Sequence, residues 1–268
     1  MGGVTPKATL DPSVEGALRR DRWVIVVTLA LVIALAWLYL WSDAGSMNQM
    51  DMPDMPGMAM PPRASGVEPF LLTFVMWTVM MVGMMLPSAA PTILLYGALV
   101  RKNGERGTVL PGTWVFTSGY LVVWTAFSLL AALLEVWLEQ TALLTPMMVS
   151  ASKGLSAGLL VAAGVYQWLP FKDACLRKCR NPIRFLVARW RPGTSGAFRM
   201  GVESGAYCVG CCWVLMLLLF VAGVMNLLWV ALIAAFVFAE KLLPAGKFTA
   251  RFAGVALILS GVALLIIP

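Results

Sequence analysis

Methionine, a scarce residue with a soft sulfur atom, gathers in one polar segment of this chain. Residues 47–60 read MNQMDMPDMPGMAM, a proline- and glycine-broken stretch between two apolar segments. Methionine normally fills gaps in a hydrophobic core, but so polar a segment has no core, and the thioether is also a soft ligand for Cu(I). Asp51 and Asp54 would attract a cation to it. We interpret the segment as a metal-capture site; a Met-rich disordered linker is the alternative. Its methionines are Met47, Met50, Met52, Met55, Met58 and Met60.

A second group of methionines lies in the sequence MWTVMMVGMMLPS, which starts at residue 76. Spacings of four place these side chains in two adjacent rows on one helix. Gly83 allows another helix to approach closely, and Pro87 cannot donate the hydrogen bond that the Gly83 carbonyl would accept. We expect a kink at Pro87 and Pro91 and a place where a soft ion rests or passes; ordinary packing is the alternative. The candidate ligands here are Met76, Met80, Met81, Met84 and Met85.

The five cysteines fall into two groups, CLRKC at 175–179 and YCVGCCW at 207–213. In the second group, spacings of three and four place the thiols on one helical face, which a methionine continues four residues later. Such a face predicts a Cu(I) site of two or three sulfur ligands. A structural zinc site and plain packing of cysteine as a small hydrophobe remain open. The candidate ligands are Cys175, Cys179, Cys208, Cys211, Cys212 and Met216.

Histidine is absent from the chain. Its absence removes the commonest proton shuttle and metal ligand, so the seventeen methionines and five cysteines must supply the ligands for any soft metal. We take Glu203 as a secondary candidate for neutralising a bound cation, and we expect Glu240 and Lys241 to snorkel at a helix end. No P-loop is present, so primary transport by this chain alone is not expected. We predict a metal-binding protein rather than an enzyme.

The composition indicates an all-α polytopic membrane protein. Of its 268 residues, 60% are hydrophobic and 12% are charged, and a soluble domain carries about twice that charged fraction. A net charge of +7 would suggest nucleic acid, but the basic residues sort by membrane side. We therefore expect the lipid bilayer, and no nucleic acid, as a partner.

We predict seven transmembrane helices, with the N-terminus in the cytoplasm and the C-terminus in the periplasm. This topology places all but Arg63 and Lys153 of the twenty lysines and arginines on the cytoplasmic side, as the positive-inside rule requires. It also places Glu135 and Glu139 in an outside turn. The predicted spans are 24–41, 70–100, 113–135, 146–169, 203–222, 226–243 and 252–268.

Three regions follow from these spans. Residues 1–41 hold a cytoplasmic tail and a retained signal-anchor helix, and residues 42–68 form the Met-rich periplasmic loop. Residues 69–268 form a six-helix membrane domain, and its basic cytoplasmic loop occupies 170–200.

Three strings in this domain resemble a bacterial family of unknown function described as predicted metal-binding integral membrane proteins. They are MWTVMMVGMMLPSAAP at 76–91, YQWLPFKDACLRKCRNP at 166–182, and GAYCVGCCWVLM followed by GVMNLLWV and FAEK through residue 241. The resemblance covers about residues 70–250 and leaves the segment 47–60 outside. A similar protein is a membrane copper chaperone for a tyrosinase-like oxidase. The resemblance implies copper handling in the inner membrane.

We therefore expect Cu(I) binding in the bacterial inner (plasma) membrane, by a chaperone, transfer protein or transporter. The outer methionines would collect the ion, the second methionine group would accept it, and the cysteines would bind it near the cytoplasm. A copper-dependent oxidase or subunits of a membrane enzyme would be its partner. Two alternatives are an accessory subunit of a larger membrane enzyme without metal chemistry, and a thiol redox protein that uses Cys208 and Cys211.

Overall fold

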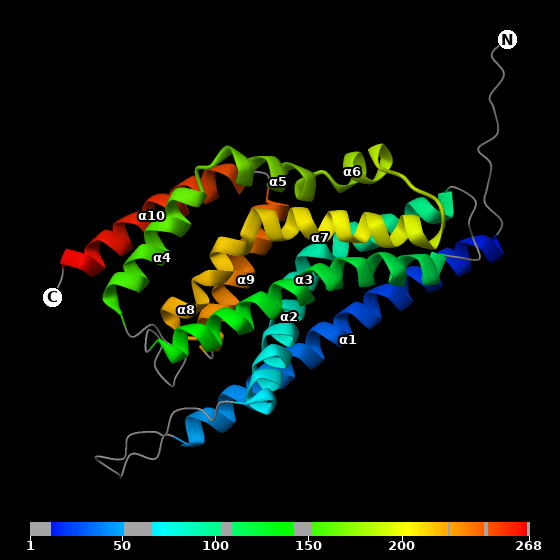
Figure 1. The fold of residues 1–268 in the computed structure, drawn as a ribbon. Helices are drawn as coiled ribbons and strands as arrows, with labels where there is room; N and C mark the ends of the chain where they lie inside the picture. Colours follow the sequence, from blue (N-terminus) through cyan, green and yellow to red (C-terminus); the bar gives the residue numbers. More distant parts are fainter. Residues whose placement is uncertain are drawn as a thin grey trace.

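The computed structural model describes residues 12–50, 66–102, 109–141, 152–224, 226–243 and 246–266. Within these ranges the regular structure is entirely α-helical, as predicted (Figure 1). The helices are α1 (Pro12–Met50), α2 (Val67–Lys102), α3 (Val109–Gln140), α4 (Lys153–Tyr166), α5 (Pro170–Arg180), α6 (Pro182–Ala188), α7 (Gly193–Leu217), α8 (Leu219–Ala222), α9 (Leu227–Leu242) and α10 (Gly246–Ile266).

Several of these helices are long and apolar enough to cross a membrane. In the described part of the chain there are five such spans, which lie in α1, α2, α3, α7 with α8, and α10. Helices α4 and α5 are bent by 64° and count as a sixth if they form one broken span. The segment expected as a further span at 226–243 is α9, whose 16 residues fall short of the roughly 20 that a bilayer requires. The described chain thus supports five or six spans where we expected seven, and the orientation of the termini stays a prediction.

Helices α2, α3 and α7 form the centre of the molecule, and α3 and α7 lie side by side (Figure 1). Glycine makes this contact close: a Cβ atom on Gly201 would overlap the Phe116 carbonyl, and one on Gly119 would overlap the Phe198 carbonyl. Small residues let two membrane helices touch backbone to backbone. The close crossing brings the cysteine-bearing part of α7 against α3 and α2.

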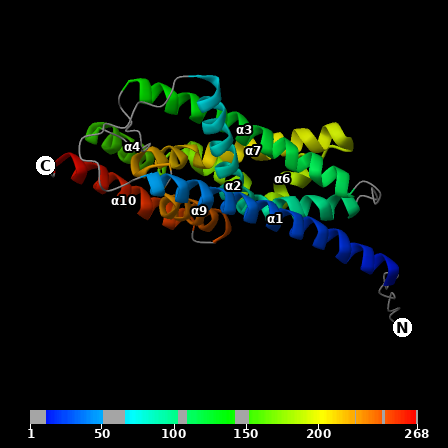
Figure 2. The same cartoon turned by 90° about the horizontal axis from the view of Figure 1, so that it is seen from below.

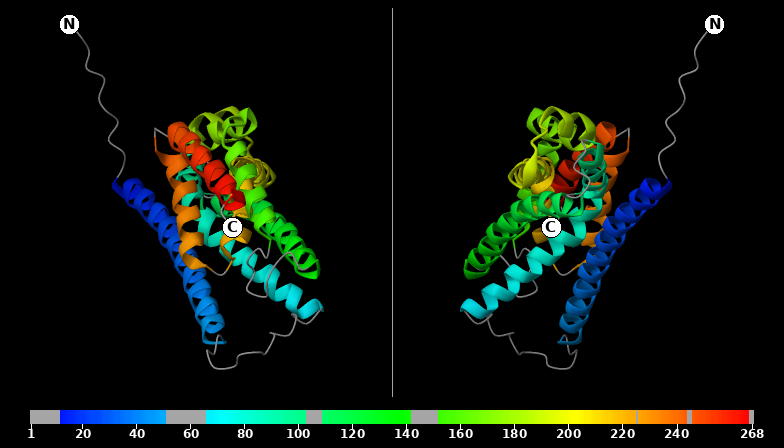
Figure 3. Two further views of the ribbon diagram at one scale, coloured as in Figure 1. Left: turned by 90° about the vertical axis from the view of Figure 1, so that its left-hand side faces the viewer. Right: turned by 90° about the vertical axis from the view of Figure 1, so that its right-hand side faces the viewer.

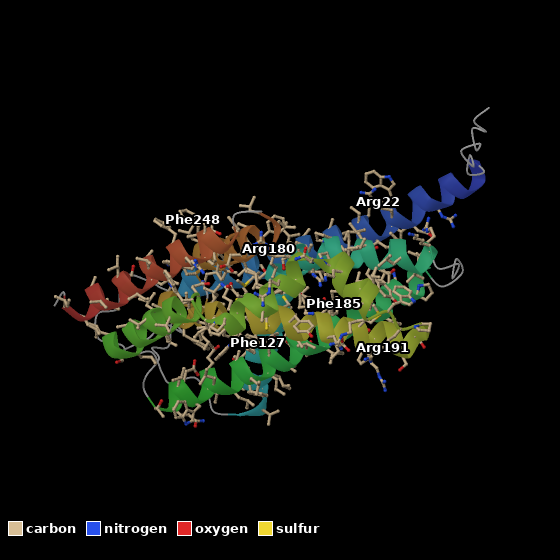
Figure 4. All side chains as sticks on the ribbon, turned by 90° about the horizontal axis from the view of Figure 1, so that it is seen from above. Arg22, Phe127, Arg180, Phe185, Arg191 and Phe248 are labelled. Atoms are coloured by element: carbon tan, nitrogen blue, oxygen red, sulfur yellow. The ribbon has the colours of Figure 1, made fainter. Side chains whose placement is uncertain are left out.

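The stretch 170–200, expected as a basic loop, is largely helical. Pro170 and Pro182 occupy the first turns of α5 and α6, where a missing backbone N–H costs nothing. Figure 3 places these two helices along one side of α7, and Figure 4 shows Arg180 and Phe185 on them. Phe185 of α6 is buried, and its ring packs against that of Tyr207 on α7. The α5–α6 segment is therefore part of the fold and brings its two cysteines to α7.

The end of α1 differs from expectation, whereas α2 changes direction part-way along, as expected of a helix that contains two prolines (Figure 2). Helix α1 extends to Met50, so the first residues of the expected loop 42–68 are helical, and Met47 and Met50 fall on the last turn of α1. Met52, Met55, Met58 and Met60 lie outside the described residues. Helix α2 continues through both of its prolines, and its ribbon changes direction part-way along (Figure 2).

Candidate metal centre

The methionines of α2 face the interior of the molecule. Each of the five is at most 3% exposed, and Met81 and Met85 are fully buried. Met85 is the member that reaches the cysteines of α7. From Met85 to Met76 is nine residues, or about 14 Å along a helix axis. The methionines therefore form a buried row that leads from the cysteines toward the beginning of α2.

The Gly83 carbonyl, which Pro87 leaves without its helical partner, is satisfied by another helix. Nε1 of Trp37 on α1 donates a hydrogen bond to it at 3.3 Å, and Ala36 packs directly over Gly83. The close approach expected at this glycine is therefore made by α1. The carbonyl is therefore hydrogen-bonded to α1 and is not an unpaired polar group among the methionines.

The cysteines of α7 are buried on the side that faces α2 and α3. Cys208, Cys211 and Cys212 are 3%, 1% and 0% exposed, and Met216 is fully buried one turn beyond them. The thiols of Cys211 and Cys212 donate to the carbonyl of Cys208, at 3.1 and 2.9 Å. Thiols inside a helix commonly satisfy themselves in this way, and both sulfurs stay close to the same turn of α7.

One pair of sulfur atoms from different helices lies within the reach of a single soft ion. Sγ of Cys212 is 4.0 Å from Sδ of Met85. A zinc–thiolate bond is about 2.3 Å long, so two sulfurs that share an ion of similar size lie no more than about 4.6 Å apart. Both side chains are fully buried. This pair joins α2 to α7 through sulfur.

Helix α5 brings its two thiols to the same turns of α7. The Cys179 thiol interacts with that of Cys211, and Sγ of Cys175 lies against Gly210, where a Cβ atom would be 2.8 Å from it. The hydroxyl of Tyr166 donates to the Gly210 carbonyl and ties the end of α4 to the same place. The two sequence groups of cysteines, about thirty residues apart, thus meet.

A lysine and a tyrosine, neither predicted as part of a site, complete the surroundings of Cys208. Nζ of Lys241 lies 2.9 Å from Sγ of Cys208 and donates to Oγ of Ser88 at 2.9 Å. The hydroxyl of Tyr120 is 3.0 Å from the same sulfur and 3.3 Å from the Met85 carbonyl. Lys241 is 7% exposed, so the expectation that it snorkels is wrong.

Glu240, the neighbour of Lys241, is also buried rather than snorkelling. Its carboxylate accepts two hydrogen bonds from Nζ of Lys172, at 2.7 and 2.9 Å, and the two side chains are 2% and 1% exposed. Lys172 also donates to Oε1 of Gln167. Because Lys172 belongs to α5 and Glu240 to α9, this ion pair fastens α5 beside the thiols.

Two other acidic residues differ from their expected places. Glu135 is fully buried on α3 and accepts a 2.5 Å hydrogen bond from Nε1 of Trp77, so it does not lie in an outside turn. Glu203 forms ion pairs with Arg189 and Arg191, each at 3.4 Å, at the surface. Its charge is therefore engaged by these arginines, away from the cysteines.

The donor set of this centre consists of thiols and thioethers. Over the described ranges, no three cysteine or acidic side chains are arranged so that they could hold a metal ion together. A tetrahedral zinc site, which needs four protein ligands, has no counterpart in this geometry. A soft ion that accepts two or three sulfurs fits better, because it can use a thioether as well as thiols.

A family model matches residues 74–264 and carries the description PpoB2, copper chaperone. This chain belongs to that family. The matched region holds the methionine row of α2 and all five cysteines, and it leaves out α1 and the segment 47–60. No curated protein and no solved structure matches the chain. The predicted copper-handling role is thereby confirmed at the level of the PpoB2 copper-chaperone family, and the membrane setting rests on the apolar helices described above.

Proposed function

We propose that this copper chaperone binds Cu(I) as its cargo between α2 and α7. Met85 and Cys212 supply the first two ligands, and the thiol of Cys211 or Cys179 is the candidate for a third. The observation that carries the proposal is the 4.0 Å separation of the Cys212 and Met85 sulfurs in a fully buried place. Thiol and thioether sulfurs prefer Cu(I) over hard cations, and the chain has no histidine to compete with them.

Cys208 takes a supporting role in this proposal. Lys241 and Tyr120 already lie within hydrogen-bond distance of its sulfur, so fewer of its lone pairs are available to a metal. Its carbonyl accepts the thiols of Cys211 and Cys212. Deprotonation of Cys212 on metal binding would release that hydrogen bond and free the sulfur to turn toward Met85.

The methionine row extends the proposed route away from the cysteines. Within each of the two rows, neighbouring methionines lie four residues apart, about 6 Å along the axis, so an ion can pass along buried thioethers without entering water. One row holds Met76, Met80 and Met84, and the other holds Met81 and Met85. The row leads toward Val67, where α2 begins. In sequence, only residues 61–66 separate this point from the Met-rich segment 47–60. We assign collection of the ion to that segment on the periplasmic side of the inner membrane, and retention to the cysteines nearer the cytoplasm.

Delivery to a copper-dependent enzyme, such as an oxidase, would complete the function of a chaperone. The α5–α6 segment covers one side of α7 and carries Cys175 and Cys179. It lies between the buried sulfurs and the surface on that side. We therefore place the exchange of copper with a partner protein at this segment.

The proposal is tested by titrating the full chain with Cu(I) in detergent, without oxygen, against a coloured Cu(I) chelator. We expect the chain to withdraw at least one Cu(I) per molecule from the chelator, and the detergent alone to withdraw none. A chain that leaves the chelator fully loaded would contradict the proposal and favour an accessory subunit without metal chemistry.

A further inference from the structure

A positively charged side chain at the edge of a proposed cation site calls for an explanation. Nζ of Lys241, on α9, is buried 2.9 Å from the Cys208 sulfur. Cys208 lies one helical turn before Cys212 on the same face of α7. A divalent ion that replaces the single proton of Cys212 adds a positive charge to the site, and this ammonium group would repel it. A methionine or leucine at the end of α9 would pack there without that repulsion.

The charge of Lys241 is not cancelled by the acidic residue beside it. Glu240 is held by Lys172, with two contacts of 2.7 and 2.9 Å, and this pair is neutral as a unit. The Lys241 ammonium instead contacts Ser88 and Cys208. The two carboxylates treated above lie elsewhere: Glu135 is bound to Trp77, and Glu203 to surface arginines. The ammonium therefore acts on whatever cation occupies the neighbouring sulfurs.

Coulomb repulsion between two ions is proportional to the product of their charges. When the metal takes the place of the Cys212 proton, Cu(I) adds no net charge beside Lys241, whereas a divalent ion adds one positive charge and is repelled. Because the group is shielded from water, this difference is only weakly screened by salt. Lys241 consequently disfavours Zn²⁺ more than Cu(I), although both are soft enough to bind sulfur.

The same lysine also limits the number of ligands. Its ammonium and the Tyr120 hydroxyl both lie within hydrogen-bond distance of the Cys208 sulfur, which removes one cysteine from the sulfurs that could bind the ion. Structural zinc sites are almost always tetrahedral with four protein ligands. A site reduced to two or three sulfurs suits a metal that needs no fourth ligand.

We propose that Lys241 is the specificity-determining residue of this centre, and that it selects monovalent Cu(I) over divalent zinc by its charge and by its contact with Cys208. This inference rests on the proposed function, because it assumes that the neighbouring sulfurs hold the cargo. It assigns to Lys241 no contact with the metal.

The test compares Cu(I) and Zn²⁺ affinities of the full chain with those of three variants, each measured with a coloured chelator for that metal. Lys241→Met and Lys241→Gln remove the charge, and the second keeps a hydrogen-bond donor; Lys241→Arg keeps the charge. Removing the charge should raise the zinc affinity and leave the Cu(I) affinity nearly unchanged. We expect a gain of about tenfold or more for zinc, with the Cu(I) affinity within about threefold of the wild type, while the arginine variant should stay within about threefold of the wild type for both metals.

Lys153→Met, which removes a lysine from the exposed first turn of α4, serves as the matched control and should change neither affinity. Two neutral variants keep the test usable if one of them fails to fold. If the ratio of the Cu(I) affinity to the zinc affinity is the same in the neutral variants as in the wild type, the inference is overturned. That result in a chain whose wild type binds Cu(I) leaves the proposed function standing, whereas a wild type that binds no Cu(I) removes the proposed function itself.

Discussion

Replacing Met85 with leucine is expected to lower the Cu(I) affinity at least about tenfold, and replacing Cys212 with serine to lower it further. Loss of a group that merely supports a metal ligand already costs about 10–100-fold in affinity, and each of these changes removes a proposed ligand sulfur. Leucine and methionine are close in volume, so the buried packing should suffer by less than about 1.5 kcal/mol. Chelator competition on the purified variants measures the effect.

Met200→Leu is the matched control for this prediction. Met200 is also fully buried on a central helix, but it precedes Cys208 by eight residues of α7, about 12 Å along the axis. Its replacement makes the same chemical change away from the sulfur pair and should leave the affinity unchanged. An equal loss in the Met200 and Met85 variants would show that the effect comes from packing and not from ligation.

The second large effect concerns the buried ion pair that fastens α5 to α9. Replacing Lys172 with methionine leaves the Glu240 carboxylate, 2% exposed, without its cation. Breaking a buried pair on one side typically destabilises a protein by about 3–5 kcal/mol. We therefore expect a clearly lower unfolding temperature for the detergent-solubilised variant, measured by tryptophan fluorescence during heating.

The double variant Lys172→Met, Glu240→Leu separates the two possible causes of this loss. Replacing both members of a buried pair by apolar groups is often neutral or stabilising, so the double variant should recover most of the lost stability. If the double variant is as unstable as Lys172→Met, then the damage lies in the packing of α5 and not in the stranded charge. Such a result would contradict our account of the pair.

Local spacing was sufficient to predict which sulfur-bearing residues share one face of each helix. The methionines of α2 and the cysteines of α7 recur at three and four residues, and a helix turns those spacings into one face whatever surrounds it. The structure places both faces in the interior and brings Met85 to Cys212. That these two faces meet is a tertiary contact, which the spacing within either helix does not indicate.

The polar members of the centre could not be predicted in the same way. Tyr120 reaches Cys208 across 88 residues and Lys241 reaches it across 33, and no periodicity within one helix indicates which other helix packs against it. Lys241 follows an apolar run, where snorkelling is the usual outcome. Its contacts with Cys208 on α7 and Ser88 on α2, which are tertiary, keep it inside.

In the described residues five or six spans are found where seven were expected, and one reason is that hydrophobicity alone does not show where a helix breaks. The apolar run expected as one span at 146–169 includes α4, whose 14 residues end at Tyr166, and a new helix begins at Pro170 with a bend of 64°. A proline disfavours the α conformation of the residue before it. The signal was therefore present at Leu169–Pro170, but it indicates a boundary and gives no direction for the next helix.

X-ray absorption at the copper edge of the Cu(I)-loaded full chain tests most directly whether sulfur holds the cargo. The account predicts a first shell of two or three sulfur atoms, with one fewer in the Met85→Leu variant. A shell of oxygen or nitrogen atoms, or a sulfur shell unchanged by both Met85→Leu and Cys212→Ser, would contradict it.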